Sequence, residues 1–539
     1  MTDALSSVGA ETVRTGADQI LTVVGDRTVA GVLLDGADRH PDRPLLVYDP
    51  LDGAEIQTYT WAHAVACSGA LARRLAEAGV GAGDAVHLHL PNRPEFLFAW
   101  FAAALLGARI VPTNTAAVAA ELAYIIGHCG AAVSLTDRDG ATTVIEARRQ
   151  AGSRGALLLC ERDVDLDAAA GAAPVAVDAR SDDDLAVMYT SGTTSRPKGV
   201  RVTHANYLFA GETVAAGLRL TEADRSLVVL PLFHANAQYY STMSTLVSGG
   251  TLVLARRFTA SGFADLAIRH DATVASLFAA PIRMILAQTP HDHWRRHRLR
   301  IVAFAQDLTD GELRRWNETI DAPLLQLYGM TETIGPPLMN AIGGRRRHDA
   351  IGRPALGYRC RIVGEDGAPA APGQPGELLV AGTPGVSLMA GYLDDPQATA
   401  AVLRDGWLHT GDLVRQGDDG LIRFVGRTRD MIKRAGENVA AGEVESVLLE
   451  HPAVTDAAVV GVPDAMRDER IIAFVTLAPG IHATSEQLRA WCADRLATFR
   501  VPEHVSVEAG LPRTAVGKIR KHQLRAAWAA RESAQGDGS

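Results

Sequence analysis

The residues that suggest chemistry most directly form a loop at positions 190–199, with the sequence TSGTTSRPKG. The apolar run 185–188 precedes it, so a strand is expected to lead into a loop rich in hydroxyl groups and backbone N–H donors, which suits a polyphosphate. The candidate phosphate ligands are Thr190, Ser191, Gly192, Thr193, Thr194 and Lys198. Lys198 supplies a compact positive charge for β- and γ-phosphates. The loop is not a Walker A motif, because Gly199 replaces the Ser or Thr that follows the lysine there. An ordinary polar surface turn is the alternative.

A second candidate segment is YGMTET at residues 328–333. Glu332 offers a hard oxygen ligand for Mg²⁺, although a single glutamate is more often a solvated surface charge. The flat ring of Tyr328 and the bare backbone of Gly329 suit a close approach to adenine. These neighbours favour the functional interpretation of Glu332.

Three charged residues in the last third of the chain complete the candidate set. Asp412 follows the turn 409–411 and can accept hydrogen bonds from both hydroxyls of a ribose, with an Asx turn as the alternative. Arg427 is a matching donor for ribose or phosphate. Lys518 lies in a loop bounded by Pro and Gly, where a lysine is ordinarily mobile and solvated.

Five motifs together resemble those of the superfamily of acyl-CoA synthetases, peptide-synthetase adenylation domains and luciferases. They are MYTSGTTSRPKGV at 188–200, YGMTET at 328–333, WLHTGDL at 407–413, GRTRD at 426–430 and PRTAVGK at 512–518. They occur in the family's order and span nearly the whole chain. The resemblance is closest to acyl-CoA ligases, and it implies an ATP-dependent enzyme that activates an acid as its AMP ester.

The resemblance also implies roles for individual residues. Thr331 is placed near the α-phosphate, Glu332 at the metal, and Lys518 between the acid's carboxylate and the α-phosphate, carried there by a moving C-terminal domain. His234, in PLFHANAQ, matches a gate beside the acyl pocket, whereas a core histidine is the alternative. The expected nucleotide-binding set adds Gln306, Asp307, Tyr328, Gly329, Met330, Asp412, Phe424 and Arg427 to the phosphate ligands.

The sequence departs from the family pattern in three places. Ser195 replaces the usual glycine of the phosphate loop, which is a mild change. Arg429 and Ala435 replace residues that are usual around the hinge, which bears on the second half-reaction. The segment 303–309, AFAQDLT, carries Gln306 and Asp307 where relatives often have small residues. With Asn236, Gln238, Tyr239 and Tyr240 nearby, these side chains predict a small or polar acid, because an apolar tail would leave them unpaired.

The elements that position these residues are predicted from hydrophobic periodicity. Strands at 85–90, 226–230 and 250–254 alternate with Ala-rich helices, notably 62–78 and the apolar 93–106. Gly- and Pro-rich turns after about residue 351 indicate a β-subdomain. We expect an α/β fold with a large layered N-terminal domain that includes this small β-subdomain, residues 1–428, and a small mobile α+β C-terminal domain, residues 429–539.

Composition limits the class of protein. The chain has 539 residues, 47% of them hydrophobic, and a formal net charge of −9, which argues against nucleic acid as the main partner. The apolar stretch 96–108 is shorter than the roughly 20 residues needed to span a bilayer. Because the N-terminus lacks signal-peptide features and the five cysteines are scattered, we expect a cytoplasmic protein with small buried cysteines.

The leading hypothesis is an acid–CoA ligase that uses ATP, Mg²⁺ and coenzyme A. The alternatives are an adenylating enzyme that uses a carrier-protein thiol as acceptor, or one that activates nitrite for diazotisation. A nucleotide-binding regulatory module without catalysis is disfavoured, because Lys198, Glu332 and Lys518 are all present. The identity of the acid, the acceptor and the oligomeric state stay open.

Overall fold

Contacts divide the chain into two compact units. The computed structural model describes residues 24–51, 53–166, 179–190, 197–343, 349–427, 431–434, 437–464, 468–513 and 519–536. Unit 1 comprises Met1–Cys360 and Val380–Leu408, and unit 2 comprises Arg361–Leu379 and His409–Ser539. Helix α14 (Ala441–Leu449) packs against strand β21 (Ile422–Arg427), so the contacts group the predicted β-subdomain with the C-terminal residues. The predicted domain boundary between residues 428 and 429 stays a prediction.

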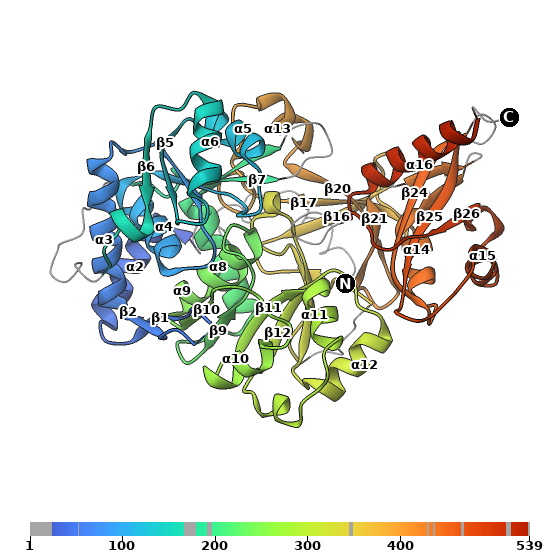
Figure 1. Ribbon diagram of the computed structural model, residues 1–539, viewed down its shortest axis with the longest axis horizontal. Coiled ribbons are helices and arrows are strands. Elements are labelled where there is room, and N and C mark those ends of the chain that lie inside the picture. The colour runs from blue at the N-terminus through green and yellow to red at the C-terminus, as the bar shows by residue number, and fades with distance from the viewer. Residues whose placement is uncertain are drawn as a thin grey trace, which may run out of the picture. The chain divides into compact units, whose positions relative to one another are not determined.

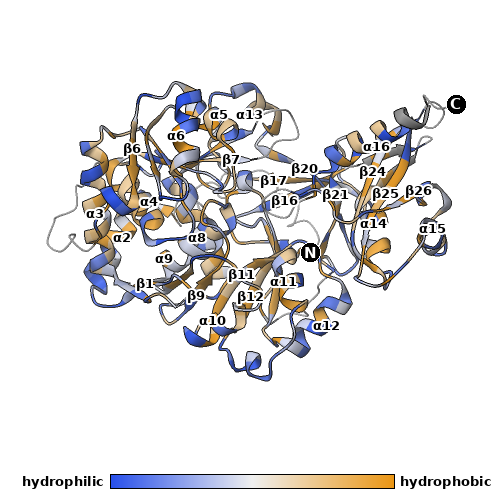
Figure 2. Cartoon of the chain, viewed as in Figure 1, coloured by the Kyte–Doolittle hydropathy of each residue, from blue (hydrophilic) through white to orange (hydrophobic). Residues whose placement is uncertain are grey.

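One sheet of unit 1, which we call sheet A, has the strand order β15-β14-β13-β12-β11-β9-β10-β1-β2. Its strands are β1 (Pro44–Asp49), β2 (Gln57–Thr60), β9 (Arg225–Val228), β10 (Thr251–Ala255), β11 (Val274–Phe278), β12 (Ile301–Ala305), β13 (Leu324–Tyr328), β14 (Leu338–Met339) and β15 (Arg353–Pro354). The central strands run parallel, and their near-continuous apolar runs suit burial on both faces. Strands β11 and β12 are accordingly hydrophobic along most of their length (Figure 2).

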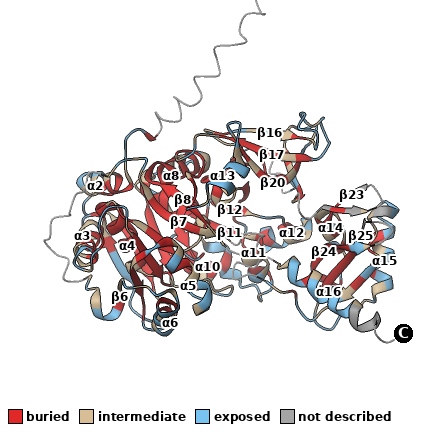
Figure 3. Cartoon of the chain, turned by 90° about the horizontal axis from the view of Figure 1, so that it is seen from above, coloured by how far each residue is buried: buried red, intermediate tan, exposed pale blue. Residues whose placement is uncertain are grey.

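The other sheet of unit 1, sheet B, has the order β18-β8-β7-β4-β3-β5-β6. Its strands are β3 (Ala85–His89), β4 (Arg109–Pro112), β5 (Ala131–Thr136), β6 (Ala156–Leu159), β7 (Asp184–Thr190), β8 (Lys198–Thr203) and β18 (Gly391–Tyr392). Strands β7 and β8 form an antiparallel hairpin, whose connection contains the predicted phosphate loop. Buried residues dominate β7, β8 and the helix that follows (Figure 3).

Helices cover the two sheets (Figure 1). In unit 1 they are α2 (Val29–Arg39), α3 (Trp61–Glu77), α4 (Pro94–Leu106), α5 (Ala119–Cys129), α6 (Ala141–Ala151), α7 (Cys160–Asp163), α8 (His204–Leu218), the π-helix η2 (Asn236–Met243), α9 (Ser244–Ser248), α10 (Phe263–Arg269), α11 (Ala279–Leu286), the 3₁₀ turns η3 (Asp292–Arg296) and η4 (Thr331–Thr333), α12 (Asp310–Thr319) and α13 (Pro396–Val402). Helix α4 begins with Pro94 at its first position and ends at Gly107 in the left-handed conformation. Its residues are almost all apolar and buried, as the sequence predicted.

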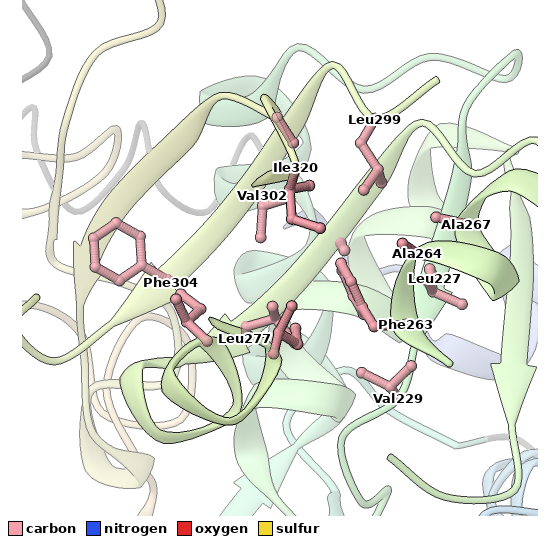
Figure 4. Packing of buried hydrophobic residues seen from close by; sticks show 14 of the residues in the cluster. Leu227, Val229, Phe263, Ala264, Ala267, Leu277, Leu299, Val302, Phe304 and Ile320 are labelled. Atoms are coloured by element: carbon pink, nitrogen blue, oxygen red, sulfur yellow. The ribbon is translucent and has the colours of Figure 1, made fainter. Parts of the chain in front are cut away.

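A large hydrophobic cluster lies between sheet A and helices α10, α11 and α12 (Figure 4). Leu227, Leu277, Val302 and Phe304 project from the sheet onto this side, and Phe263 packs on them from α10. Because side chains alternate along a strand, Ser276 and Ala303 point to the opposite face of sheet A. On that other side, η2 packs against β9 and β11, and α8 packs against both η2 and α9.

Unit 2 contains β-hairpins followed by a mixed α and β segment. In one of its sheets β17 (Gly376–Ala381) lies between β16 (Arg359–Val363) and β20 (Trp407–Gln416), and β21 pairs with β20, whereas β19 (Leu403–Arg404) belongs to unit 1. The second has the order β23-β22-β25-β24 with β26 on β25, where the strands are β22 (Met431–Arg434), β23 (Glu437–Ala440), β24 (Val454–Asp464), β25 (Asp468–Leu477) and β26 (His504–Val507). Its helices are α14, α15 (Ser485–Ala493), the short η6 (Thr498–Arg500) and α16 (Lys521–Gly536).

Two expectations about membranes and cysteines can be compared with the structure. Within the described ranges, no helix combines the length and apolar character that crossing a bilayer requires. All five cysteines are free, and all but Cys360 are buried. This confirms the prediction of small buried cysteines for the other four.

Candidate functional site

The predicted phosphate loop joins the two strands of the β7–β8 hairpin. Thr190 and Lys198 face each other at its end, whereas Ser191, Gly192, Thr193 and Thr194 lie outside the described residues. Helix α5 supports both strands of the hairpin. Tyr124 donates a hydrogen bond from Oη to the carbonyl oxygen of Pro197 at 3.1 Å, and His128 Nδ1 lies 2.7 Å from Tyr189 Oη. The two ends of the loop are therefore fixed to a helix of the same unit.

The predicted adenine and metal motif follows the end of strand β13. Tyr328 is the last residue of the strand, and Thr331 and Glu332 lie in the 3₁₀ turn η4. The backbone N–H of Met330 donates to Thr333 Oγ1 at 2.9 Å, which closes the turn. A side chain at position 329 would collide with the hydroxyl of Tyr240, so glycine is required there. The fold therefore brings the backbone of Gly329 against η2.

Tyr392 connects the lysine of the hairpin with the glutamate of η4. The ammonium nitrogen of Lys198 lies 5.0 Å from the centre of the Tyr392 ring, a cation–π arrangement. On the other side, Tyr392 Oη donates to Glu332 Oε1 at 3.1 Å. The predicted phosphate ligand and the predicted metal ligand are therefore held by one aromatic side chain that sequence reasoning missed.

The electrostatics of this trio keep Tyr392 as a hydrogen-bond donor. Burial raises the pKa of the Tyr392 hydroxyl above its ordinary value, and the negative charge of Glu332 raises it further. The buried carboxylate of Glu332 suits Mg²⁺, which is commonly held by one or two carboxylates together with substrate phosphates. Among the described residues, no group of three or more His, Cys, Asp and Glu side chains is arranged to hold a metal. The Glu332 carboxylate therefore suits a Mg²⁺ ion whose other ligands include the phosphates of a nucleotide.

His234 lies in the loop that leads from β9 into η2. The backbone N–H of Gln238 donates to its carbonyl oxygen at 3.2 Å, and its ring lies 4.1 Å from the ring of Phe233. Asn92 fixes this loop, because its side chain accepts from Leu232 N at 2.8 Å and donates to the Leu230 and Ala255 carbonyls. This anchor was not predicted, since it joins residues about 140 positions apart.

Gln306 and Asp307 follow strand β12. Gln306 has a backbone φ of 75°, and both side chains are accessible to solvent. Gln326 Nε2 donates to the Gln306 carbonyl oxygen at 3.0 Å and to Asp307 Oδ1 at 2.8 Å. The surrounding protein raises the pKa of the Asp307 carboxyl because it desolvates the charged form. Gln326 therefore fixes the segment that follows β12 at both Gln306 and Asp307.

Unit 2 holds the predicted ribose ligands. Asp412 on β20 pairs in register with Arg427 on β21, and Arg427 Nε lies 3.0 Å from Asp412 Oδ1. Asp412 N donates to Thr410 Oγ1 at 3.1 Å within strand β20, which runs without a break from Trp407 to Gln416, so the turn expected at 409–411 is not present. Phe424 lies on the same strand as Arg427. Lys518 lies outside the described residues.

Within unit 1, the structure thus brings Lys198 and Glu332 together through Tyr392, and Gly329 against Tyr240 of η2. Within unit 2 it pairs Asp412 with Arg427. Sequence spacing gave no signal for Tyr392, which lies 60 positions from its partner Glu332. A lone tyrosine after a glycine is too common to mark a site.

Family models match most of the chain. The model of the AMP-binding enzyme family matches residues 33–393, and the model of the AMP-binding enzyme C-terminal domain matches residues 443–518. The first match alone covers well over half of the chain and includes Lys198, Glu332 and Tyr392.

Individual relatives agree with these matches. The chain is 34% identical to a crotonobetaine/carnitine–CoA ligase of Proteus mirabilis over 520 residues, which are 94% of this chain and 100% of the relative. It is 36% identical to the enzyme of the same name from Shigella sonnei over 461 residues, 83% of this chain and 89% of the relative. Among solved structures, ATP-bound MatB from Rhodopseudomonas palustris matches with a TM-score of 0.83 and 28% identity, covering 93% of this chain and 99% of that one.

Proposed function

The chain belongs to the AMP-binding enzyme family, and from that premise we propose that its substrate is a small or polar carboxylic acid. The enzyme is an ATP-dependent, AMP-forming acid–CoA ligase. An oxygen of the acid's carboxylate attacks the α-phosphorus of ATP, and the bond to the β-phosphate breaks, releasing pyrophosphate. The sulfur of coenzyme A then attacks the acyl carbonyl, and AMP leaves.

The roles of the site residues are part of this proposal. Lys198 and Glu332 carry it, because a cation and a carboxylate held on either side of Tyr392 suit a polyphosphate and its metal. Lys198 offsets charge on the β- and γ-phosphates, while Thr331 offers a hydroxyl to the α-phosphate. Mg²⁺, when bound through Glu332, neutralises phosphate charge. Asp412 accepts from the ribose hydroxyls, and Arg427 orients that carboxylate.

The preference for a small or polar acid is supported by the surroundings of Gly329. Tyr240 reaches this glycine from η2, a helix whose first turn carries Asn236, Gln238 and Tyr239. Asn236 and Tyr239 are buried and have polar side-chain atoms without partners among the described residues, so a long apolar chain next to them would leave these atoms without hydrogen bonds. The two relatives named above are ligases of crotonobetaine and carnitine, which are also short polar acids.

The experiment is a pyrophosphate-release assay with short, polar, aromatic and long-chain acids and with nitrite, each with and without coenzyme A. Short or polar acids are expected to give the highest rates, with thioester formed only when coenzyme A is present. Preference for a long-chain acid would refute the proposed substrate class.

Lys518 is tested separately, because we propose that it bridges the carboxylate and the α-phosphate. Lys518→Ala should reduce acyl-adenylate formation by at least about 100-fold while ATP binding, measured by calorimetry, is kept. Lys521→Ala is the matched control, since Lys521 pairs with Glu445 at 2.7 Å and has no proposed catalytic role. Unchanged adenylation in the Lys518 variant would remove this residue from the mechanism.

A further inference from the structure

The π-helix η2 is unusual in both its hydrogen-bonding pattern and its burial. It runs from Asn236 to Met243, and every one of its residues is buried. π-helical segments are rare and are concentrated at functional sites. Helix η2 packs against β9 and β11, it begins two residues after His234, and its Tyr240 hydroxyl lies against Gly329 of the motif 328–333.

Three buried side chains on η2 and β11 have polar atoms without hydrogen-bond partners. In the part of the chain that the structure describes, neither Oδ1 nor Nδ2 of Asn236 has a partner, and the same is true of Tyr239 Oη and Ser276 Oγ. Asn236 and Ser276 are 5% exposed and Tyr239 is 0% exposed. Each buried, unsatisfied polar group costs roughly 1–3 kcal/mol, so folding alone does not explain a group of them.

Two other polar side chains in the same helix, Gln238 and Thr242, have hydrogen-bond partners. Gln238 accepts from Tyr207 Oη at 2.5 Å and donates to the Leu232 carbonyl at 2.6 Å. Thr242 donates to the Ala237 carbonyl oxygen at 2.8 Å. The unpaired atoms therefore belong to selected positions of η2, and those positions are free to bind a ligand.

These positions lie beside the reaction centre. The charge of Glu332 contributes to raising the pKa of Tyr239, which places the two side chains within electrostatic reach, and Tyr240 contacts Gly329. Ser276 projects from β11 on the face of sheet A opposite the large apolar cluster, the face against which η2 packs. Its neighbour in register on β12 is Ala303.

We propose that Asn236, with Tyr239 and Ser276, is a specificity-determining residue that binds an uncharged hydroxyl or carbonyl group on the acid. The inference rests on the proposed function and narrows its substrate class. An amide presents one acceptor and two donors, which match a hydroxyl that both donates and accepts. The three side chains are uncharged, so they provide no ion pair for a charged substituent. A site built in this way rejects the analogue that lacks the polar group, because its own buried atoms then stay unpaired.

The test compares pairs of short acids that differ only in one hydroxyl, such as 3-hydroxybutanoate and butanoate. The readout is the ratio of the two kcat/KM values, measured by pyrophosphate release. Wild-type enzyme should favour the hydroxylated acid of at least one pair by about tenfold or more, and Asn236→Leu should bring that ratio close to one. Ser276→Ala, which removes only one oxygen, should lower the ratio in the same direction.

Thermal stability distinguishes a binding role from a structural one. Asn236→Leu removes no side-chain hydrogen bond formed among the described residues, so its unfolding temperature should equal or exceed that of wild type. The matched control is Asn206→Leu on α8. Asn206 is also a buried amide, but it donates to the Val386 and Leu388 carbonyls at 2.7 and 2.8 Å and accepts from Thr203 N at 3.1 Å. This control should be clearly less stable while keeping the ratio of wild type.

The outcomes separate the two proposals. Normal activation of acids with an unchanged ratio in both Asn236→Leu and Ser276→Ala would overturn this inference alone. A wild-type preference for the unsubstituted acid of every pair would also overturn it. Wild-type enzyme that releases pyrophosphate with none of the acids would overturn the proposed function and this inference together.

Discussion

Unit 1 buries polar side chains in two regions, and they are built differently. In sheet B, His87 on β3 lies between Ser134 Oγ at 3.2 Å and Thr113 Oγ1 at 2.9 Å, and Arg148 donates to the same serine at 2.8 Å. Every member of this network has a partner. Around η2, by contrast, Asn236, Tyr239 and Ser276 keep polar atoms unpaired within the described chain. Burial of polar groups therefore does not by itself identify a site, and the unpaired atoms are what distinguish the η2 region from the sheet B network.

The largest effect that tests this comparison is expected at Glu332. Glu332→Gln keeps the shape of the side chain but removes its charge, so acyl-adenylate formation should fall by about 100- to 1,000-fold. The unfolding temperature should change little, because glutamine keeps a side-chain oxygen that can accept the hydrogen bond from Tyr392 Oη. Rates are measured by pyrophosphate release at saturating Mg²⁺.

The control for Glu332 is Glu95→Gln. Glu95 forms a two-point ion pair with Arg93, at 2.8 and 2.6 Å, in a part of unit 1 with no proposed catalytic group. This variant should lose stability and keep its adenylation rate. If Glu332→Gln instead lost stability and kept its rate, the carboxylate would belong with the structural network and not with the site.

The sequence predicted the residues and elements that short-range patterns determine. The motif 328–333, the strand before the phosphate loop and the apolar helix α4 each follow from short-range pattern, and the α/β fold class with a large and a small part is confirmed. Tyr392 and Asn92 were missed because their partners lie 60 and 140 positions away. The π-helix η2 was missed for another reason, since a run of polar and aromatic residues has no periodicity that predicts it.

The second prediction concerns the paired region and follows from the pKa of His87. Burial lowers this pKa to about 3, with smaller contributions from the charges of His89 and Arg148, whereas the unfolded chain has the ordinary value of 6.5. Between these two values the unfolded state binds a proton that the folded state does not. Stability is therefore complete above pH 6.5 and is lost as the pH falls, by roughly 1 kcal/mol per pH unit from this group.

The measurement is the unfolding midpoint between pH 7 and pH 4.5 for wild type and His87→Gln. The variant should show a shallower decline, because the titrating group is gone, although His204, whose pKa burial lowers to about 4, still contributes. His522→Gln, at an exposed position of α16, should decline as wild type does. If the unfolding midpoints of His87→Gln and wild type declined with pH at the same rate, burial in the sheet B network would not hinder protonation of His87. The contrast between this network and the η2 region would then fail.

The smallest expected effect is at Tyr392, which is paired like the sheet B network but lies in the site. Tyr392→Phe removes the hydrogen bond to Glu332 and keeps the ring that faces Lys198. The Mg²⁺ concentration for half-maximal adenylation should rise by about tenfold, because a hydrogen bond to a charged group contributes roughly 1.5–3 kcal/mol. Tyr392→Leu also removes the ring, so it should raise the KM for ATP as well.

The two variants separate the contact of the Tyr392 hydroxyl with Glu332 from the contact of its ring with Lys198. Calorimetric titration of each with ATP, at low and high Mg²⁺, separates metal-dependent from metal-independent binding without relying on turnover. Tyr59→Phe is the control, because Tyr59 Oη donates to Gln57 Oε1 at 3.0 Å within strand β2 and its loss should leave both quantities unchanged. If Tyr392→Phe also left them unchanged, the hydroxyl would only satisfy a buried carboxylate. We expect Tyr392→Phe to change only the Mg²⁺ requirement and Tyr392→Leu to weaken ATP binding as well. That result would show that a side chain with hydrogen-bond partners can still belong to the reaction centre, when those partners are the groups that bind substrate.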